Sequence, residues 1–218
     1  MGALYRSDSL STLRGEDRER FQALGVRTVI DLRHEWEIAA AGRVPESDEL
    51  RYHNFSIERQ PYYQAGLDPR VDAVSFLAER FAEVAADGVT ELRQTLEVIA
   101  SEGSAPVVFH CAGGKDRSGI VAALVLALLG VSQDDIAADF ALTEATRDWL
   151  IADWRRTHPG EASLWPGYGR ATAELMRLFL SDLAAKHGSV RDYTANLLGV
   201  TDDAVIALHV QYLGGEPG

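Results

Sequence analysis

The residues best suited to chemistry lie together in one stretch, residues 106–130. Cys111, the only cysteine of the 218-residue chain, stands six positions before Arg117. An apolar run typical of a buried strand leads into Cys111, and an apolar run typical of a helix follows Arg117. We therefore expect a strand, a tight loop with two adjacent glycines and a helix N-terminus. Such a unit directs backbone N–H groups at one place and makes a cradle for an anion.

This cradle could support nucleophilic attack on phosphorus. Amides, a helix N-terminus and nearby cations favour the thiolate form of Cys111, which would attack a phosphoryl group and form a phosphocysteine that water then hydrolyses. Arg117 could hold two phosphoryl oxygens with its planar fork of donors, which a lysine cannot do. Ser118 could donate a hydrogen bond to the departing thiolate. The amides expected to bind the equatorial oxygens belong to Ala112, Gly113, Gly114 and Lys115.

The reaction also needs a proton donor for the departing alkoxide or phenolate. Asp116 lies in the loop itself and is the first candidate. Glu58 and Asp68 are the alternatives, because they lie on a long predicted surface loop over residues 58–70, and loops of this length are often functional. His110, next to the cysteine, is expected to orient the loop rather than to act as a base.

Other interpretations of the same residues are less consistent with the sequence. A nucleotide-binding Walker loop needs Gly-x-x-x-x-Gly-Lys-Ser/Thr, whereas Asp116 follows the lysine and position 109 is not glycine. A single cysteine excludes an internal disulfide and CxxC zinc spacing, and the histidines show no metal spacing, so we expect no cofactor or metal. Arsenate reduction would need a second thiol. A lone cysteine is often inert, but here strand, glycines, cations and helix occur together.

Composition limits the classes of partner. The formal net charge is −12 and the pI about 4.9, which argues against non-specific nucleic-acid binding. A phosphate site must therefore create its own local positive field. The longest apolar run, residues 120–129, is too short to cross a membrane, and the N-terminus has no apolar secretion region. We expect no integral membrane segment and, by default, a cytoplasmic protein.

The order of elements predicts an α/β fold. Strands are expected at residues 4–7, 26–32, 52–57 and 107–110, among many helices. Thr90, Ser132, Ser189 and Thr201 are expected to cap helices, and Trp149, Trp154 and Trp165 to pack. Asp31 and Arg33 are expected to brace the sheet end. We predict a single domain over 1–218, with a central, mostly parallel sheet of about four or five strands flanked by helices and a helical C-terminal extension.

The loop resembles the signature of a known family. His-Cys-Ala-Gly-Gly-Lys-Asp-Arg-Ser-Gly at 110–119 is similar to the signature of cysteine-dependent protein tyrosine phosphatases. The Gly-Lys-Asp-Arg form is similar to the bacterial atypical, lipid-phosphatase-like branch. Further resemblances lie at residues 4–7, 24–33 and 187–201, and Glu37 falls where that branch carries a glutamate. The resemblance covers residues 4–213.

The resemblance implies a phosphoric monoester hydrolase that forms a phosphocysteine without metal. Cys111 would be its nucleophile, Arg117 its phosphate-binding arginine and Asp116 its acid. Substrates would be phosphotyrosine, sometimes phosphoserine or phosphothreonine, and phosphoinositides, with inorganic phosphate as a bound ligand. Lys115 would suit inositol phosphates, and residues 144–187 would form a helical lid. The alternative is a phosphate-binding, scaffolding pseudophosphatase without turnover.

Overall fold

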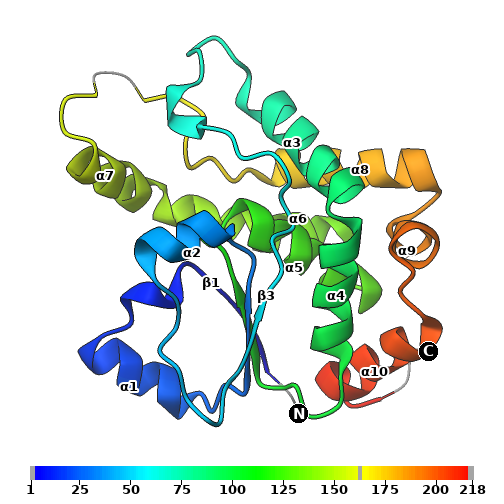
Figure 1. The fold of residues 1–218 in the computed structure, drawn as a ribbon. Helices are drawn as coiled ribbons and strands as arrows, with labels where there is room; N and C mark the ends of the chain where they lie inside the picture. Colours follow the sequence, from blue (N-terminus) through cyan, green and yellow to red (C-terminus); the bar gives the residue numbers. More distant parts are fainter. Residues whose placement is uncertain (1–2, 162–163, 216–218) are drawn as a thin grey trace.

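Four parallel strands form the central sheet of the computed structural model, which describes residues 3–161 and 164–215 (Figure 1). The strands are β1 (Leu4–Ser7), β2 (Thr28–Asp31), β3 (Arg51–Asn54) and β4 (Val107–His110). Their order across the sheet is β1-β4-β2-β3, so β4 has a neighbour on each side. The predicted α/β class and parallel sheet are confirmed.

The register brings the carboxyl ends of three strands to one edge. Ser7 of β1 and Asp31 of β2 both lie beside His110, the last residue of β4. The loops that follow these strands therefore meet at this edge. In open parallel sheets, ligands bind at the carboxyl ends of the strands, so the fold places the segment after His110 where a site is expected.

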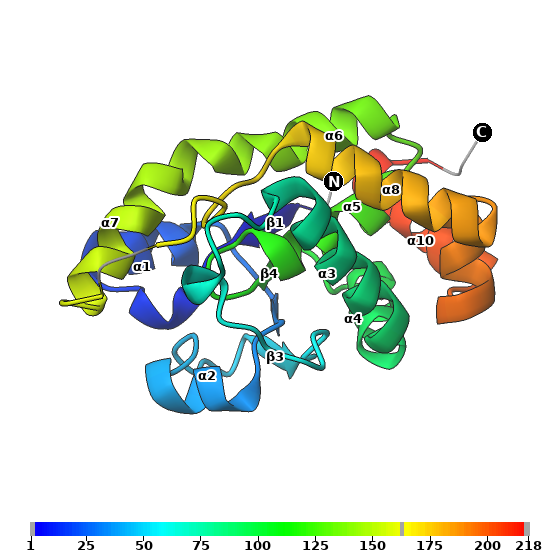
Figure 2. The same ribbon diagram turned by 90° about the horizontal axis from the view of Figure 1, so that it is seen from above.

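Helices cover both faces of the sheet (Figures 1 and 2). In the described chain they are α1 (Gly15–Ala23), α2 (Glu35–Ala41), α3 (Ala73–Asp87), α4 (Val89–Ala100), α5 (Asp116–Leu128), α6 (Gln133–Ala141), α7 (Arg147–Thr157), α8 (Ala173–His187), α9 (Val190–Asp192) and α10 (Asp202–Leu213). Short helical turns lie at η1 (Leu10–Thr12), η2 (Gln64–Gly66), η3 (Leu142–Thr146) and η4 (Tyr193–Leu198). Among these helices, none is both long and apolar enough to cross a membrane.

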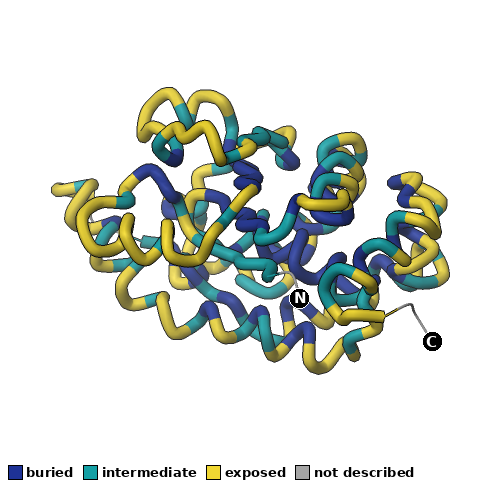
Figure 3. Tube along the Cα trace, turned by 90° about the horizontal axis from the view of Figure 1, so that it is seen from below, coloured by how far each residue is buried: buried dark blue, intermediate teal, exposed yellow. Residues whose placement is uncertain are grey.

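The sheet separates two apolar cores of unequal size. Ile30 and Phe109 point into the large core, where α3, α4, α5, α6 and α8 pack. Val29 and Val108, their neighbours along the strands, point to a small core beside Phe21 of α1. This alternation is the period of two that a pleated strand imposes. Figure 3 shows the buried residues gathered in the middle of the fold and the exposed ones along its periphery.

Most of the predicted helix caps are confirmed. The side chains of Ser132, Ser189 and Thr201 accept hydrogen bonds from the first turns of their helices. The cap predicted at Thr90 is wrong, because α4 begins at Val89, directly after Gly88 ends α3. Gly88 is required there, since a Cβ would lie 2.3 Å from the carbonyl oxygen of Ile57.

The region predicted to form a lid, residues 144–187, contains most of η3 and all of α7 and α8, and residues 162–163 within it lie outside the described part of the chain. Trp154 and Trp165 are buried, as expected of packing residues, but Trp149 is 59% exposed. The expectation that Trp149 packs is therefore wrong. It lies on the solvent side of α7, a polar helix whose only buried residue is Trp154 among those described.

Candidate active site

Residues 111–115 form the loop that joins β4 to α5, and it is pressed against the end of β1. Gly114 has a φ of +63°, and a Cβ on it would lie 2.8 Å from the backbone nitrogen of Asp8. Only glycine tolerates both conditions. The backbone N–H of Ser9 donates to the carbonyl of Ala112 at 3.2 Å. Both contacts fix the loop in one conformation.

The sulfur of Cys111 lies at the bottom of this loop, 3% exposed as a residue. The hydroxyl of Ser118, which is fully buried on the first turn of α5, lies 3.7 Å from the sulfur. The thiol thus faces a hydroxyl and the N-terminus of a 13-residue helix, whose unpaired N–H groups and dipole favour negative charge. The arrangement suits an anion bound above the sulfur.

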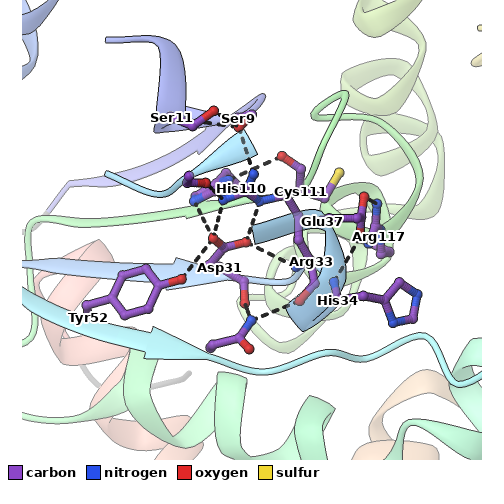
Figure 4. A network of polar contacts seen from close by, with 12 residues as sticks. Ser9, Ser11, Asp31, Arg33, His34, Glu37, Tyr52, His110, Cys111 and Arg117 are labelled. Carbon is purple, nitrogen blue, oxygen red and sulfur yellow. Dashed lines mark hydrogen bonds and ion pairs between the residues drawn. The ribbon is translucent and has the colours of Figure 1, made fainter. Parts of the chain in front are cut away.

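Arg117 is held by a carboxylate from a different part of the chain. Its Nη1 and Nη2 donate to Glu37 at 2.5 and 2.9 Å, so one carboxylate fixes the plane of the guanidinium (Figure 4). Glu37 is itself placed by the first turn of α2, where it accepts from the backbone N–H of His34 at 2.8 Å. Burial acts to raise the pKa of Glu37, but the hydrogen bonds and charge of Arg117 outweigh it and the pKa is lowered. Glu37 therefore stays ionised beside the arginine.

A cavity of about 160 Å³ opens beside Arg117. Two more carboxylates border it, Asp116 from the first turn of α5 and Glu58 from the segment after β3. Two aromatic side chains, Trp36 and Tyr62, also line it. The lining of the cavity thus combines the Arg117 guanidinium with three carboxylates, those of Glu37, Glu58 and Asp116, and with two aromatic side chains.

The buried edge of the sheet behind this cavity is held by an ion pair. Arg33 donates from Nε and Nη2 to the two oxygens of Asp31 at 2.9 and 2.7 Å, and both residues are almost fully buried. Its remaining nitrogen donates to Ser9 at 3.1 Å, and the hydroxyl of Tyr52 donates to Asp31 at 2.9 Å (Figure 4). Asp31 and Arg33 brace the sheet end, as the sequence suggested.

His110 connects this ion pair to the loop. Its Nδ1 lies 3.2 Å from the carbonyl oxygen of Cys111 and so donates to it, while its Nε2 lies 3.6 Å from Asp31. Burial lowers the pKa of His110 more than the charge of Asp31 raises it. The buried His110 ring thus lies between the Asp31–Arg33 pair and the backbone of the loop.

Comparison with known proteins identifies the family. A model described as the tyrosine phosphatase family matches residues 1–214. The chain belongs to the tyrosine phosphatase family. This membership confirms the predicted phosphatase.

Two relatives show how far the similarity extends. A tyrosine-protein phosphatase of Nostoc commune is 28% identical over 221 residues, covering 96% of this chain and 74% of the relative. The triple specificity protein phosphatase PtpB of Mycobacterium tuberculosis is 27% identical over 166 residues, covering 64% of this chain and 60% of that protein. The matched part is therefore shorter than either relative.

In this phosphatase, Lys115 does not line the cavity beside Arg117. It is 4% exposed, its Nζ donates to the carbonyl of Arg170 at 3.1 Å, and it lies 3.3 Å from Oδ1 of Asp116. The ammonium thus joins the loop to the segment before α8. The Lys115 ammonium is therefore already paired and is not placed to bind an additional phosphate group.

The structure separates the three candidate proton donors. Asp116 and Glu58 border the cavity, whereas Asp68 does not. Asp68 is bound by Arg70, with Oδ2 2.6 Å from Nη2, in an exposed turn. Asp68 is therefore not positioned to donate a proton in this cavity, because its carboxylate pairs with Arg70 outside it.

Sequence reasoning did not single out three residues at this phosphatase site. His34, Trp36 and Tyr62 border the cavity together with the predicted residues. Their positions depend on α2 and on the path of the segment after β3, and no local pattern carries that information. Among residues 3–161 and 164–215, no group of three His, Cys, Asp or Glu side chains is placed to hold a metal ion.

Proposed function

We propose that this phosphatase hydrolyses phosphotyrosine through a phosphocysteine on Cys111. The observation that carries the proposal is the position of the Cys111 sulfur, under the N-terminus of α5, with Ser118 at 3.7 Å. In the first step the thiolate attacks phosphorus and the leaving oxygen departs. In the second step water attacks the phosphocysteine, and Ser118 donates to the thiolate that leaves.

Each loop residue has a role in this mechanism. The amides of Ala112, Gly113, Gly114 and Lys115 bind the equatorial phosphoryl oxygens, and Arg117 binds two of them with its oriented fork. Asp116 or Glu58 supplies the proton to the leaving oxygen. His110 keeps the loop in shape.

The aromatic wall supports phosphotyrosine as the preferred substrate. Trp36 and Tyr62 border the cavity and can contact a phenyl ring. Lys115 is bound to a backbone carbonyl, so it does not offer the second free charge that a phosphoinositide would use. Dual specificity toward phosphoserine and phosphothreonine, and phosphoinositide hydrolysis, are the alternatives to compare. The proposed setting is cytoplasmic, where a catalytic thiol stays reduced.

A pseudophosphatase is the competing function. Against it stands the presence of both Cys111 and an oriented Arg117, because a cradle without turnover needs no nucleophile. The experiment is hydrolysis of p-nitrophenyl phosphate with EDTA present, followed by a panel of phosphotyrosine peptides, phosphoserine peptides and phosphoinositides. We expect turnover that resists EDTA and is fastest on phosphotyrosine.

The matched variant is Cys111→Ser, with thermal unfolding as the control for folding. We expect loss of turnover with retained binding of inorganic phosphate. Full activity in this variant would contradict the phosphocysteine mechanism. A wild-type protein that binds phosphate without turnover would support the pseudophosphatase instead.

A further inference from the structure

A second cavity, of about 630 Å³, lies on the small-core side of the sheet, away from the phosphate loop. Helix α1, the amino ends of β2 and β3, and residues 44–50 surround it. The phosphate loop follows the carboxyl end of β4, and the strands are parallel, so the cavity and the loop lie at opposite ends of the sheet. Neither Cys111 nor Arg117 lines this cavity.

The cavity is present because this face of the sheet is thinly covered. Helices α3, α4, α5, α6 and α8 pack on the large core, whereas α1 lies beside the small core and none of its residues is buried. Within α1, Phe21 is the residue that packs against the small core. Small-molecule sites have volumes of roughly 300–1,000 Å³, so this cavity is large enough to hold a ligand.

The part of the lining that belongs to the small core is apolar. Leu13, Phe21, Val26, Val44 and Leu50 line the cavity, and all five are members of that core. Val44 is 3% exposed, whereas the other four are only partly buried. An apolar group in the cavity would remove more of their surface from water, which is favourable.

Two exposed arginines also border the cavity. They are Arg18 of α1 and Arg27, which directly precedes β2. Within residues 3–161 and 164–215 neither side chain makes an ion pair, although Arg20 on the same helix pairs with Glu16 at 2.8 Å. A guanidinium group binds a carboxylate or a similar anion through two parallel hydrogen bonds. These arginines therefore favour a ligand that carries negative charge.

The carboxylates in the lining do not cancel this positive charge. Glu46 is paired with Arg43, and Glu49 is exposed. Arg51 adds a third guanidinium, which donates from Nη2 to the carbonyl of Gly103 at 2.6 Å. Three arginines and two glutamates thus line the cavity, which gives it a positive balance in a chain of net charge −12.

We propose that this cavity binds an amphipathic anion, with its apolar body against Phe21 and Val44 and its carboxylate or sulfonate at Arg18 and Arg27. A neutral apolar ligand would leave both guanidinium groups without a partner, and a small inorganic anion would leave the apolar lining in contact with water. The combination of the two surfaces therefore specifies the class of ligand. Because the cavity is separate from the phosphate loop, this ligand and a phosphate ester bind at the same time.

The test uses the fluorescent anion 8-anilinonaphthalene-1-sulfonate on the full chain, with and without saturating inorganic phosphate. The neutral dye N-phenyl-1-naphthylamine is the matched ligand, because it has the same rings without the sulfonate. We expect saturable binding of the sulfonate dye at one site per chain, with a dissociation constant that phosphate does not change.

The matched variants separate the arginines of the cavity from arginines elsewhere. In the double variant Arg18→Gln, Arg27→Gln we expect about tenfold weaker binding of the sulfonate dye and unchanged binding of the neutral dye. Arg93→Gln, at an exposed position of α4 on the other face of the sheet, should bind both dyes like the wild type. Thermal unfolding checks that all variants fold, and hydrolysis of p-nitrophenyl phosphate should be unchanged in the double variant.

Several results would overturn the proposal. Absence of saturable binding would remove the site, and binding of the sulfonate dye that phosphate abolishes would place the dye in the phosphate loop instead. Equal weakening of both dyes in the folded double variant, or the same weakening in Arg93→Gln, would exclude recognition of the anion by Arg18 and Arg27. A dimer in sedimentation equilibrium that excludes the dye would show that a second copy of the chain covers the cavity.

Discussion

The protein contains two arginine–carboxylate pairs near the active site, and they differ in their surroundings. Arg33 and Asp31 are almost fully buried, and Ser9, Tyr52 and the carbonyl of Gly42 complete their hydrogen bonds. Arg117 and Glu37 are joined by the same two-pronged contact, but their side chains are 12% and 13% exposed and they border a cavity. Both pairs join a guanidinium to a carboxylate through two hydrogen bonds, but only the Arg117–Glu37 pair lines this cavity.

This difference in burial suggests that the Asp31–Arg33 pair stabilises the fold and that the Glu37–Arg117 pair prepares a binding site. In the buried pair, each of the three Arg33 nitrogens already donates to a protein acceptor, so we expect this pair to hold the sheet edge rather than to bind a ligand. The Arg117–Glu37 pair fixes the plane of a guanidinium that lines a cavity. Substitutions in the first pair should therefore act mainly on stability, and substitutions in the second mainly on catalysis.

The largest effect is expected for Arg117→Lys. A lysine keeps the charge but loses the planar fork that binds two oxygens. We expect kcat/KM for p-nitrophenyl phosphate to fall on the order of 10³-fold, with the melting temperature little changed. Steady-state kinetics and thermal unfolding measure the two quantities. A melting temperature that falls as far as that of Asp31→Asn would remove the distinction between the pairs.

The next effect is expected for Asp31→Asn. It leaves the Arg33 guanidinium buried without a counter-charge, which should lower the free energy of unfolding by about 3–5 kcal/mol. Chemical denaturation measures this change. Tyr52→Phe is the matched control, because it removes one hydrogen bond to the same carboxylate and should cost about 2 kcal/mol. Equal losses in both variants would show that the ion pair adds nothing beyond that hydrogen bond.

The same pair predicts a dependence on pH. Burial acts to raise the pKa of Asp31, but its hydrogen bonds with Arg33 and the nearby positive charges lower it below its ordinary value of 3.8. The stabilisation from the charged form is therefore complete above about pH 4 and is lost as the pH falls through the lower, folded value. The gap in unfolding free energy between wild type and Asp31→Asn should be constant near neutral pH and shrink below about pH 4. A gap that grows on acidification would contradict the lowered pKa.

The smallest effect is expected for Glu37→Gln. Glutamine can still accept from Arg117 but lacks the charge that fixes the guanidinium. We expect kcat/KM to fall about tenfold through poorer orientation, with a loss of about 1 kcal/mol in unfolding free energy. Kinetics and denaturation on the same preparation measure both. A loss of stability like that of Asp31→Asn would place this pair with the buried one.

Much of the fold could be predicted from local patterns. The β-branched run before Asp31 and the apolar run before Cys111 predict buried strands, since strands covered on both faces are continuously apolar. The helix start predicted at Thr90 was wrong because the position of Gly88 is set by its close approach to Ile57, a residue far away in the sequence. The exposure of Trp149 likewise depends on how α7 lies, which no helical spacing reveals.

The site was predictable only where its residues are neighbours in sequence. Cys111, Ser118 and Arg117 lie on one strand–loop–helix unit, so spacing alone brings them together. Glu37 was noted only because the related family carries a glutamate at that position. Its hydrogen bond with Arg117 depends on how α2 packs against the loop, which the sequence does not show. The burial of Lys115 could not be predicted, because the carbonyl that it binds belongs to Arg170.

The contact between the phosphate loop and β1 has a consequence for folding. Gly114 leans on the backbone of Ser7 and Asp8, and β1 pairs with β4 in a register that joins Leu4 to Val107. The phosphate loop therefore gains its contact with β1 only after β1 has paired with β4, which lies about a hundred residues later in the chain. Contacts between segments so far apart in sequence form slowly. Regain of activity during refolding would therefore report the completed chain topology, and the N-terminal strand is as much a part of the cradle as the loop itself.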